Sequence, residues 1–374
     1  MSKKFKIVLI ANTFNFFNAF MLEHIRQLSK NNEVFICCNE AYKLKRIVPK
    51  KVILVNINFK RGISLLNDFF AFVSVLFFFF KKKPNISISF TPKVGFIVSL
   101  CSFISMTPYR IHWFTGQIWV KRGGVIRIFY RLIDKLISFL SNDIFIDSIS
   151  QKNFLIKEKI ISKDKSIVFH KGSVGGVDVK KFKFNQIKRN KIRKQLQISK
   201  KTFVFLYLGR INSDKGIEDL VTAFDSVKIN HDIFLIFVGS IEETKFRKIL
   251  NNKKKILYFK PTNKPEEWFS MADILCLPSH REGFGTVVIE AAACGIPAIC
   301  SKIYGLTDAV IKNKTGFFHK VSNINDIKNK MTYVIKNTDL VKKYGIQAKK
   351  RVFKDFKKNL LTERLLKFVN SKKY

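Results

Sequence analysis

Short apolar runs alternate with longer stretches of mixed polarity along most of this chain. Such runs, bounded by turn-forming residues, are typical of strands buried in a parallel sheet. The longer stretches have helical length, so the first half is predicted to be a doubly wound α/β domain. Its expected strands are 5–10, 33–37, 52–55, 86–90, 110–114, 144–147 and 167–170. The helices expected between them are 17–30, 63–82, 94–105, 126–140 and 148–156.

The same alternation resumes at Thr202, after an irregular segment, 172–182, that we interpret as an interdomain loop. Two such halves predict two Rossmann-like domains that face each other across a cleft, where open α/β sheets bind ligands. The expected domains are 1–178 and 179–355, and the tail 356–374 is expected to be a helix that could pack back on the first domain. The strands expected in the second half are 203–208, 233–238, 256–259, 274–277 and 296–300.

The stretch 277–300 carries the strongest sign of a ligand site. A buried strand delivers a loop with two glycines to an expected helix at 287–294, with Thr286 as its N-cap. Glycine suits backbone that takes positive φ or comes close to a ligand. The N–H groups and the dipole at a helix start favour an anion such as phosphate. Two carboxylates, Glu282 and Glu290, frame this loop and helix start.

The residues of this stretch resemble a known signature. Glu282, Gly283, Phe284, Gly285 and Glu290, followed by Ala-Ala-Ala-Cys-Gly-Ile-Pro, are similar to the E-x7-E motif of retaining nucleotide-sugar glycosyltransferases of family 4, which have the GT-B fold. The alternative is an unrelated βα turn with two solvated glutamates, for which the spacing, both glycines and the trailing residues would all have to coincide. The resemblance covers nearly the whole chain. Phe90-Thr91-Pro92-Lys93, followed by an apolar helix, also resembles a first-domain segment of relatives that act in capsule, O-antigen or lipid-linked oligosaccharide assembly.

Two further segments carry candidate chemistry. Gly209-Arg210 follows an expected strand and Lys215 opens an expected helix, so two cations beside a helix start could hold a diphosphate. The alternative is a βα loop with ordinary surface cations, but the segment also resembles the G-R-x4-K-G element of the same family. His112 lies near the end of an expected first-domain strand, where a lone histidine is more often structural. It resembles the family histidine that reaches the donor sugar.

The resemblance implies a role for each of these side chains. Arg210, Lys215 and the helix that starts near Thr286 would neutralise the leaving diphosphate. Glu290 would accept hydrogen bonds from the ribose, Glu282 would hold sugar hydroxyls, and His112 would orient the sugar. The expected catalytic residues are His112, Arg210, Lys215 and Glu282. The expected donor-binding residues are Gly209, Arg210, Lys215, Glu282, Gly283, Phe284, Gly285, Thr286 and Glu290. No D-x-D triplet or zinc motif occurs in the sequence, so neither a metal nor another cofactor is expected.

The charge of the chain points to an anionic partner. It has 69 Lys and Arg residues against 27 Asp and Glu, a formal net charge of +42. Nucleic acid, anionic lipid and phosphate-rich substrates all fit this charge, but no nucleic-acid-binding module is legible. The six cysteines form no C-x-x-C pair and are expected to be buried thiols in a reducing cytosol. Asn12 and Asn15 interrupt the apolar start, which we interpret as a strand rather than a secretory signal.

The most apolar stretch, Phe69–Phe80, is followed by Lys81-Lys82-Lys83. As a helix it would be about 18 Å long, too short for a hydrocarbon core of about 30 Å. Two interpretations remain open: a core helix of a doubly wound domain, or a helix that lies on an anionic membrane surface.

Together these features predict a cytoplasmic glycosyltransferase that lies peripherally on the inner face of the plasma membrane. It would move a hexosyl or N-acetylhexosaminyl group from a nucleoside diphosphate sugar, most simply a uridine one, with retention of configuration. The acceptor would be a membrane-associated glycan or a polyprenyl-linked intermediate in surface polysaccharide synthesis. A sugar-nucleotide epimerase of similar fold and a nucleic-acid-binding protein are the alternatives.

Overall fold

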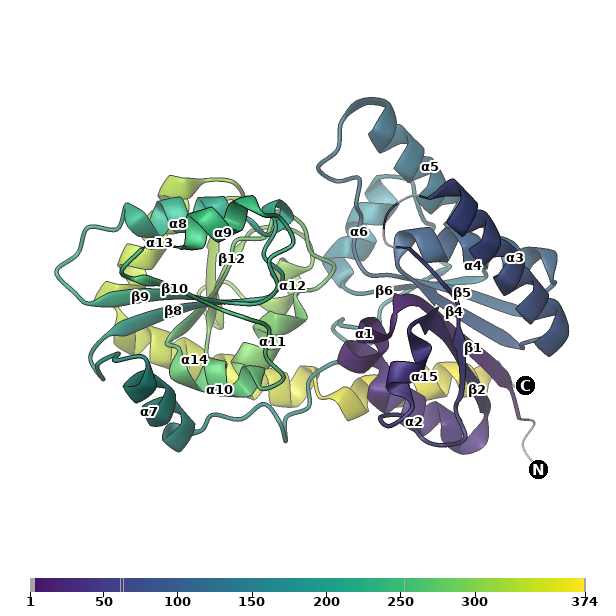
Figure 1. Ribbon diagram of the computed structural model, residues 1–374, viewed down its shortest axis with the longest axis horizontal. Coiled ribbons are helices and arrows are strands. Elements are labelled where there is room, and N and C mark those ends of the chain that lie inside the picture. Colours follow the sequence, from purple (N-terminus) through teal and green to yellow (C-terminus); the bar gives the residue numbers. More distant parts are fainter. Residues whose placement is uncertain (1–3, 61, 63, 252, 373–374) are drawn as a thin grey trace. The chain divides into compact units, whose positions relative to one another are not determined.

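The computed structural model describes residues 4–60, 62, 64–251 and 253–372. The chain forms two compact units (Figure 1). Unit 1 comprises Met1–Gly176 and Lys358–Tyr374, and unit 2 comprises Val177–Lys357. Each unit has its own sheet and its own buried cores. The expected boundaries, after residues 178 and 355, each differ from these by two residues.

Unit 1 is built on a parallel sheet of seven strands in the order β3-β2-β1-β4-β5-β6-β7. The strand order reverses between β1 and β4, so the carboxyl ends of these two strands form the topological switch point of this unit. The expected doubly wound sheet is therefore present, although its last strand is shorter than expected. The strands are β1 (Lys6–Thr13), β2 (Glu33–Asn39), β3 (Ile53–Asn56), β4 (Ile86–Phe90), β5 (Tyr109–Phe114), β6 (Asp143–Ile146) and β7 (Ser166–Ile167).

Helices cover both faces of this sheet because successive strand residues point to opposite sides. Val8 and Ile10 of β1 pack with α3 and α4, whereas Ile7 and Leu9 pack with α2 and α15. α3, α4 and α5 lie side by side on one face (Figure 1). The helical elements are α1 (Phe14–Phe16), the π-helical η1 (Phe17–Met21), α2 (Leu22–Asn31), the 3-10 turn η2 (Ala41–Leu44), α3 (Leu65–Lys82), α4 (Pro92–Ile104), α5 (Gly124–Leu140), α6 (Ile149–Lys157) and α15 (Lys358–Ser371).

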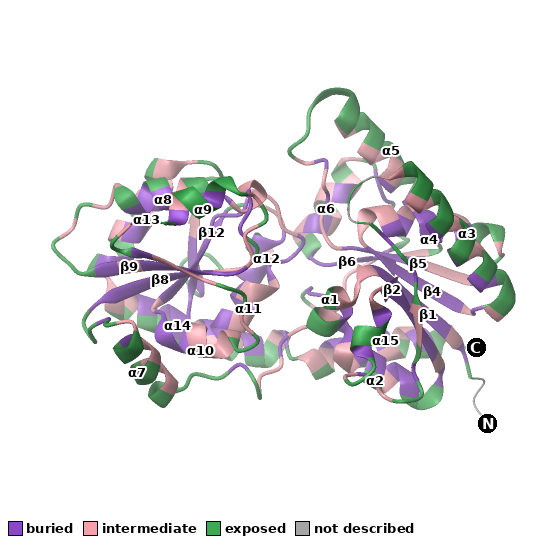
Figure 2. Cartoon of the chain, viewed as in Figure 1, coloured by how far each residue is buried: buried purple, intermediate pink, exposed green. Residues whose placement is uncertain are grey.

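The ends of α3 follow from local sequence. Lys83 adopts a left-handed conformation with φ of 46°, and Pro84 follows it, so the helix cannot continue. The expected first residue, Ile63, lies outside the described residues. α3 buries Ala71, Val75, Phe78 and Phe79 on one face only, while its other face is exposed (Figure 2).

Unit 2 contains a parallel sheet of six strands in the order β10-β9-β8-β11-β12-β13. Its switch point lies between β8 and β11, so the loops that follow these two strands start at neighbouring points on one sheet edge. The strands are β8 (Phe203–Leu208), β9 (Ile233–Val238), β10 (Ile256–Phe259), β11 (Ile274–Leu277), β12 (Ala298–Ser301) and β13 (Gly316–His319). The helical elements are α7 (Gln186–Gln195), the 3-10 turn η3 (Ser213–Lys215), α8 (Ile217–Asp225), α9 (Lys245–Leu250), α10 (Pro265–Met271), α11 (Thr286–Ala293), α12 (Leu306–Ala309), α13 (Ile324–Lys336) and α14 (Thr338–Asp355).

The C-terminal helical region differs from its prediction. The tail 356–374 is expected to be a helix, but α14 ends at Asp355 and α15 begins only at Lys358, after an interruption at residues 356 and 357. Phe356 breaks the helix because its fully buried ring packs against Phe284 in the core of unit 2. Its carbonyl also accepts a hydrogen bond of 2.7 Å from the N–H of Val177.

α15 completes unit 1. Leu361, Leu365 and Val369 belong to the buried cluster that also contains α2 and the sheet. The hydroxyl of Thr362 lies 2.9 Å from Nδ1 of the buried His24. The C-terminal segment is therefore part of the core of this unit rather than a surface addition.

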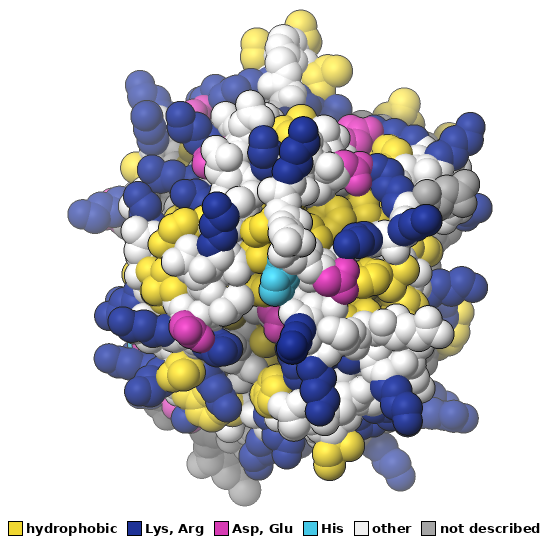
Figure 3. All heavy atoms as spheres, turned by 90° about the vertical axis from the view of Figure 1, so that its left-hand side faces the viewer, with side chains coloured by type: hydrophobic (Ala, Val, Ile, Leu, Met, Phe, Trp, Pro, Cys, Tyr) yellow, Lys and Arg dark blue, Asp and Glu magenta, His cyan; other side chains and the backbone are white. Residues whose placement is uncertain are grey.

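The six cysteines are all buried and free, as expected for small apolar side chains. On the face shown in Figure 3, Lys and Arg side chains surround apolar patches and form no single stripe. No helix in the described part of the chain combines the length and the apolarity needed to cross a bilayer.

Candidate functional site

Two predicted site residues meet at the switch point of unit 2. Lys215 ends the loop after β8, and Glu282 lies in the loop after β11. Lys215 Nζ lies 2.5 Å from Glu282 Oε1, and both side chains are about six-sevenths buried, with 15% and 14% exposed. The hydroxyl of Ser279 donates to the same carboxylate oxygen at 2.8 Å. The Glu282 carboxylate is therefore held in one orientation by a charge and a hydroxyl.

A second set of contacts ties the same two loops together. The Arg281 guanidinium donates to Asp214 Oδ2 at 2.9 and 2.5 Å, and the His280 N–H donates to the Asp214 carbonyl at 2.8 Å. Burial alone would raise the pKa of the Asp214 carboxyl, but the hydrogen bond and charge of Arg281, with Lys215 and His280, hold that pKa below its usual range. His280 Nε2 also lies 2.7 Å from Asp219 Oδ2 on α8. The two loops thus form one rigid charged surface.

At two positions of the site, glycine allows the backbone to lie close to neighbouring atoms. Gly216 has φ of +65°, and a Cβ there would lie 2.3 Å from the carbonyl oxygen of Pro278. Gly285 has φ of +83°, and a Cβ there would lie 2.4 Å from Leu306 Cδ2. An L-residue at either position would strain the backbone; at position 216 it would also push the two loops apart, and at position 285 it would displace the side chain of Leu306.

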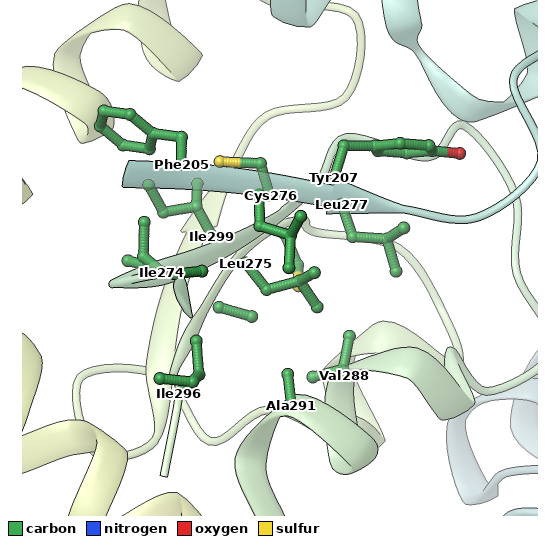
Figure 4. Packing of buried hydrophobic residues seen from close by; sticks show 14 of the residues in the cluster. Phe205, Tyr207, Ile274, Leu275, Cys276, Leu277, Val288, Ala291, Ile296 and Ile299 are labelled. Carbon is green, nitrogen blue, oxygen red and sulfur yellow. The ribbon is translucent and has the colours of Figure 1, made fainter. Parts of the chain in front are cut away.

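The structure corrects the expected start of the phosphate-binding helix. Gly285, not Thr286, is the N-cap of α11, and no side chain caps this end. Thr286 is the first helical residue, and the first turn carries no carboxylate. The helix is fixed on the side that faces the sheet, because Val288 and Ala291 point toward Leu275 and Leu277 of β11 (Figure 4). The amino terminus of α11 is thus a rigid site with N–H groups suited to an anion.

Phe284 differs from the other residues of the motif. Its side chain is buried, and its ring centroid lies 5.3 Å from that of Phe356. The expected ligand contact of Phe284 is therefore limited to its backbone, and the ring itself stabilises the core under the loop.

Arg210 lies in the same β8 loop, with a side chain that is 47% exposed. Its Nη1 lies 3.2 and 3.3 Å from the two carboxylate oxygens of Glu242, in the loop after β9. The carbonyl of Arg210 accepts a hydrogen bond of 2.5 Å from the hydroxyl of Tyr207. The backbone of Arg210 is therefore fixed, whereas its guanidinium is accessible to solvent and to a ligand.

Sequence reasoning missed two carboxylates that hold this loop. Glu242 accepts from Asn212 Nδ2 at 2.7 Å, and Glu243 accepts from the N–H and the hydroxyl of Ser213 at 2.8 and 2.6 Å. The signal was available, because both glutamates lie in the loop that follows the expected strand 233–238. Strands β8 and β9 are neighbours, so residues after their carboxyl ends meet at one edge.

Glu290 lies one turn into α11 in a different environment from Glu282. Its side chain is half-buried, and burial raises the pKa of its carboxyl to about 7. The charge of Lys181 opposes that increase in pKa, and the charge of Glu266 adds to it. The two glutamates of the motif therefore differ: Glu282 is ion-paired, whereas Glu290 changes protonation state near neutral pH.

His112 lies in unit 1, in the middle of β5, and is fully buried. Its Nδ1 lies 2.9 Å from the hydroxyl of Ser89, and its ring packs so closely on Gly95 of α4 that a Cβ there would lie 2.2 Å from Cε1. Burial lowers the pKa of the imidazole to about 3, so the ring is neutral. Nε2 is buried without a hydrogen-bond partner among the described atoms. The environment is that of a structural histidine, and its contact with a donor sugar remains a prediction.

A cavity of about 1190 Å³ lies elsewhere in unit 2, at the edge where the strands begin. Its lining includes Phe203, Asp273 and Pro297, which lie at or just before the amino ends of β8, β11 and β12. None of the predicted site residues lines it. The candidate site is therefore defined by its side chains and loops rather than by this cavity. Among the described residues, no group of three or more His, Cys, Asp or Glu side chains could hold a metal ion.

The comparisons with known proteins agree with this geometry. The family model described as "Glycosyl transferases group 1" matches residues 188–351. The capsular polysaccharide biosynthesis glycosyltransferase CapM of Staphylococcus aureus is 30% identical over 359 residues, which cover 94% of this chain and 92% of CapM. This chain belongs to the group 1 glycosyltransferases. The matched segment of the glycosyltransferase contains Arg210, Lys215, Glu282 and Glu290.

Other relatives extend the likeness of this glycosyltransferase. An Escherichia coli enzyme described as UDP-Gal:alpha-D-GlcNAc-diphosphoundecaprenol alpha-1,3-galactosyltransferase is 25% identical over 289 residues, which cover 75% of this chain and 73% of that enzyme. The crystal structure of Anabaena HepE in complex with UDP and glucose superposes with a TM-score of 0.80 at 16% identity, over 98% of this chain and all of HepE. The expected GT-B fold, with two parallel α/β domains, is thereby confirmed.

Proposed function

We propose that unit 2 of this glycosyltransferase binds a nucleoside diphosphate sugar, specifically a uridine diphosphate sugar, at the carboxyl edge of its sheet. The observation that carries the proposal is the Lys215–Glu282 pair beside the uncapped amino terminus of α11. A cation, a set of backbone N–H groups and a fixed carboxylate lie on two loops that flank one switch point. This set fits a diphosphate next to a sugar.

In the proposed reaction the bond between the anomeric carbon of the sugar and the diphosphate breaks, and negative charge grows on the leaving oxygen. The acceptor hydroxyl oxygen bonds to that carbon, and its proton passes to the departing diphosphate. Arg210, Lys215 and the start of α11 would stabilise that charge. A diphosphate that binds Lys215 would share this cation with Glu282, leaving oxygens of the carboxylate available to sugar hydroxyls. Glu290 would accept hydrogen bonds from the ribose. The proposed transfer retains the configuration of the sugar and uses protein cations rather than a metal.

For His112 the proposal is narrower. A neutral, buried imidazole supports the strand that carries it, and it orients a sugar only if Nε2 becomes accessible when substrate binds. A His112→Gln variant separates the two roles. A change in the Michaelis constant for the donor without a change in thermal stability would support sugar contact, and an equal loss of stability and activity would assign a structural role.

The acceptor is proposed to be a membrane-associated glycan or a polyprenyl-linked intermediate of surface polysaccharide synthesis, and the transferred group a hexose or an N-acetylhexosamine. The support comes from the relatives: the name of CapM refers to capsular polysaccharide, and that of the Escherichia coli enzyme to a diphosphoundecaprenol-linked substrate. The enzyme would then work at the cytoplasmic face of the plasma membrane.

The test is a calorimetric titration of the full-length protein with UDP, UDP-glucose, UDP-galactose and their N-acetylamino forms, followed by transfer assays with a polyprenyl-diphosphate acceptor. We expect one UDP sugar to bind and to be consumed only when acceptor is present. Conversion of the nucleotide sugar without acceptor would support an epimerase instead. No binding of any UDP sugar by folded protein would overturn the proposal.

A further inference from the structure

Helix α5 of unit 1 has an unusual distribution of side chains, because its apolar stripe faces outward. Positions 125, 129, 132, 136 and 139 follow the spacing of one helical face. In a helix of a globular protein such a stripe normally packs on the core, whereas here it is exposed. The exposed apolar residues of α5 are Val125, Ile126, Ile128, Phe129, Leu132, Leu136 and Phe139, each between 41% and 81% exposed.

The inner side of α5 is held to unit 1 by the buried Ile137 and by polar groups. Asp134 is buried, and Trp119 Nε1 donates to its Oδ2 at 2.7 Å. Arg127 and Arg131 lie over the Trp119 ring at 5.6 and 5.5 Å and close to Glu158, at 3.5 and 3.1 Å. These contacts fix the orientation of the helix. The exposed stripe is therefore a defined surface of the fold.

Helix α3 presents a second exposed apolar face. Its inner side contributes to the core, and its outer side exposes seven large apolar residues. Core packing thus describes the inner face of this helix, and contact with a membrane surface stays a prediction for the outer face. α4 lies between α3 and α5, and all three run along the same face of the sheet (Figures 1 and 2). The exposed residues of α3 are Leu65, Leu66, Phe69, Phe70, Val73, Phe77 and Phe80.

The charges around these two helices have one sign. Segments 64–83 and 121–140 contain two carboxylates, Asp68 and Asp134. Asp68 is paired with Lys93 at 2.5 Å, and Asp134 is buried. The basic residues of the two segments are Lys81, Lys82, Lys83, Lys121, Arg122, Arg127, Arg131 and Lys135. The outer surface therefore combines apolar side chains with a basic margin.

We propose that the exposed faces of α3 and α5, here called the docking face, bind the surface of an anionic lipid bilayer. Apolar side chains would enter the boundary between headgroups and acyl chains, and the basic margin would contact lipid phosphates. A second copy of the chain is a poorer partner, because each copy carries a net charge of +42 and brings basic residues to the same edge. The identity of the acceptor rests on the proposed function, but the docking face rests on exposure and charge alone.

The experiment is flotation of the full-length protein with phosphatidylcholine vesicles, with and without phosphatidylglycerol, at low and high salt. The docking-face variant carries Phe129→Ser, Leu132→Ser, Leu136→Ser and Phe139→Ser. The matched control carries the same change at two phenylalanines and two aliphatic residues of comparable exposure in unit 2, namely Phe184→Ser, Ile187→Ser, Ile346→Ser and Phe353→Ser. We expect wild type and control to bind phosphatidylglycerol vesicles. The docking-face variant should bind these vesicles at least about tenfold more weakly than wild type.

A charge variant, with Lys81→Gln, Lys83→Gln and Lys135→Gln, should weaken binding by about fivefold per residue at low salt and by less at high salt. Equal vesicle binding by wild type and the docking-face variant would overturn the proposal. The proposal would also be overturned if the wild-type protein did not bind vesicles but sedimented as a dimer, while the docking-face variant sedimented as a monomer. UDP-sugar binding without vesicles is measured on the same proteins. If the wild-type protein binds vesicles but binds no UDP sugar, the proposed function is rejected and the docking face stands.

Discussion

The charge of Lys215 and the charge of Glu282 are each stabilised by the other. The pair is mostly buried, so removing one partner leaves a poorly solvated charge as well as a missing ligand contact. The effects of Lys215→Ala and Glu282→Gln should therefore be non-additive, since the two groups are in direct contact. Arg210 is more exposed and is paired with Glu242. The effect of Arg210→Ala should therefore add to that of Glu282→Gln.

The first prediction concerns the two cations. Lys215→Ala and Arg210→Ala should each cost about 2.7–4 kcal/mol of transition-state stabilisation, if each loss resembles that of one oxyanion-hole donor. The loss should appear in kcat more than in KM, because the charge grows as the diphosphate departs. Steady-state kinetics with donor and acceptor measure both constants. Lys228→Ala, an exposed lysine between β8 and β9, is the control and should keep wild-type kcat. Normal kcat with weaker donor binding would show that the two cations only bind substrate.

The second prediction concerns Glu290. Glu290→Ala should abolish donor-dependent transfer while circular dichroism shows an intact fold. Because burial raises the pKa of this carboxyl to about 7, its ionised fraction grows as the pH rises through that value. Donor affinity of the wild type should therefore increase over that range, and Glu290→Gln should give a flat profile. Wild-type turnover in a folded Glu290→Ala protein would remove Glu290 from the site.

At the scale of elements, α5 shows what an amphipathic pattern can and cannot reveal. The spacing of apolar residues predicts a helix, and a helix is present at Gly124–Leu140. The spacing does not say whether the apolar stripe packs inward or faces out. The orientation of α5 depends on contacts of Asp134 with Trp119, of Arg131 with Glu158 and of Ile137 with the core, which only the fold brings together.

The third prediction follows from the buried carboxyl of Asp134. Burial raises the pKa of this group from 3.8 to about 7. Between these values the folded state keeps a proton that the unfolded state releases. The free energy of unfolding contributed by Asp134 should thus fall as pH rises, by at most about 1.4 kcal/mol per pH unit, and level off above about 7.

Asp134→Asn keeps an oxygen for the Trp119 N–H and removes the titration. Urea denaturation over this pH range should show a shallower slope in Asp134→Asn than in wild type. Glu290 contributes in the same direction, so the difference between the two proteins is the measured quantity. Asp339→Asn, at a side chain that is 93% exposed, should leave the slope unchanged. Equal slopes in wild type and Asp134→Asn would contradict the prediction.

The strands of both sheets and the assignment of Lys215 and Glu282 to one site were accessible from sequence for one reason. Parallel strands give continuous apolar runs, and loops after neighbouring carboxyl ends must meet. Other features depended on contacts between distant residues. Phe356 ends α14 because Phe284 receives its ring, and the N-cap of α11 at Gly285 has positive φ at a point where Leu306 occupies the space of a Cβ.

At the scale of the whole molecule, the chain begins and ends in unit 1, while every expected donor-binding residue lies in unit 2. Unit 2 is one continuous segment with a single large buried cluster. Unit 1 needs two separate segments, because α15 supplies part of its core. The two units should therefore respond differently to truncation.

The last prediction tests this difference. Residues 177–357 expressed alone should fold and bind UDP. A chain that ends at Lys357 should lose the folding of unit 1, because Leu361, Leu365 and Val369 are almost fully buried. Each such side chain contributes about 1.5–3 kcal/mol, so the sum is comparable to the lower part of the 5–15 kcal/mol that stabilises a typical domain. Limited proteolysis should degrade unit 1 of the truncated chain and spare unit 2, whereas the full chain resists in both. A truncated chain whose unit 1 resists proteolysis as well as wild type would show that α15 is dispensable for that core.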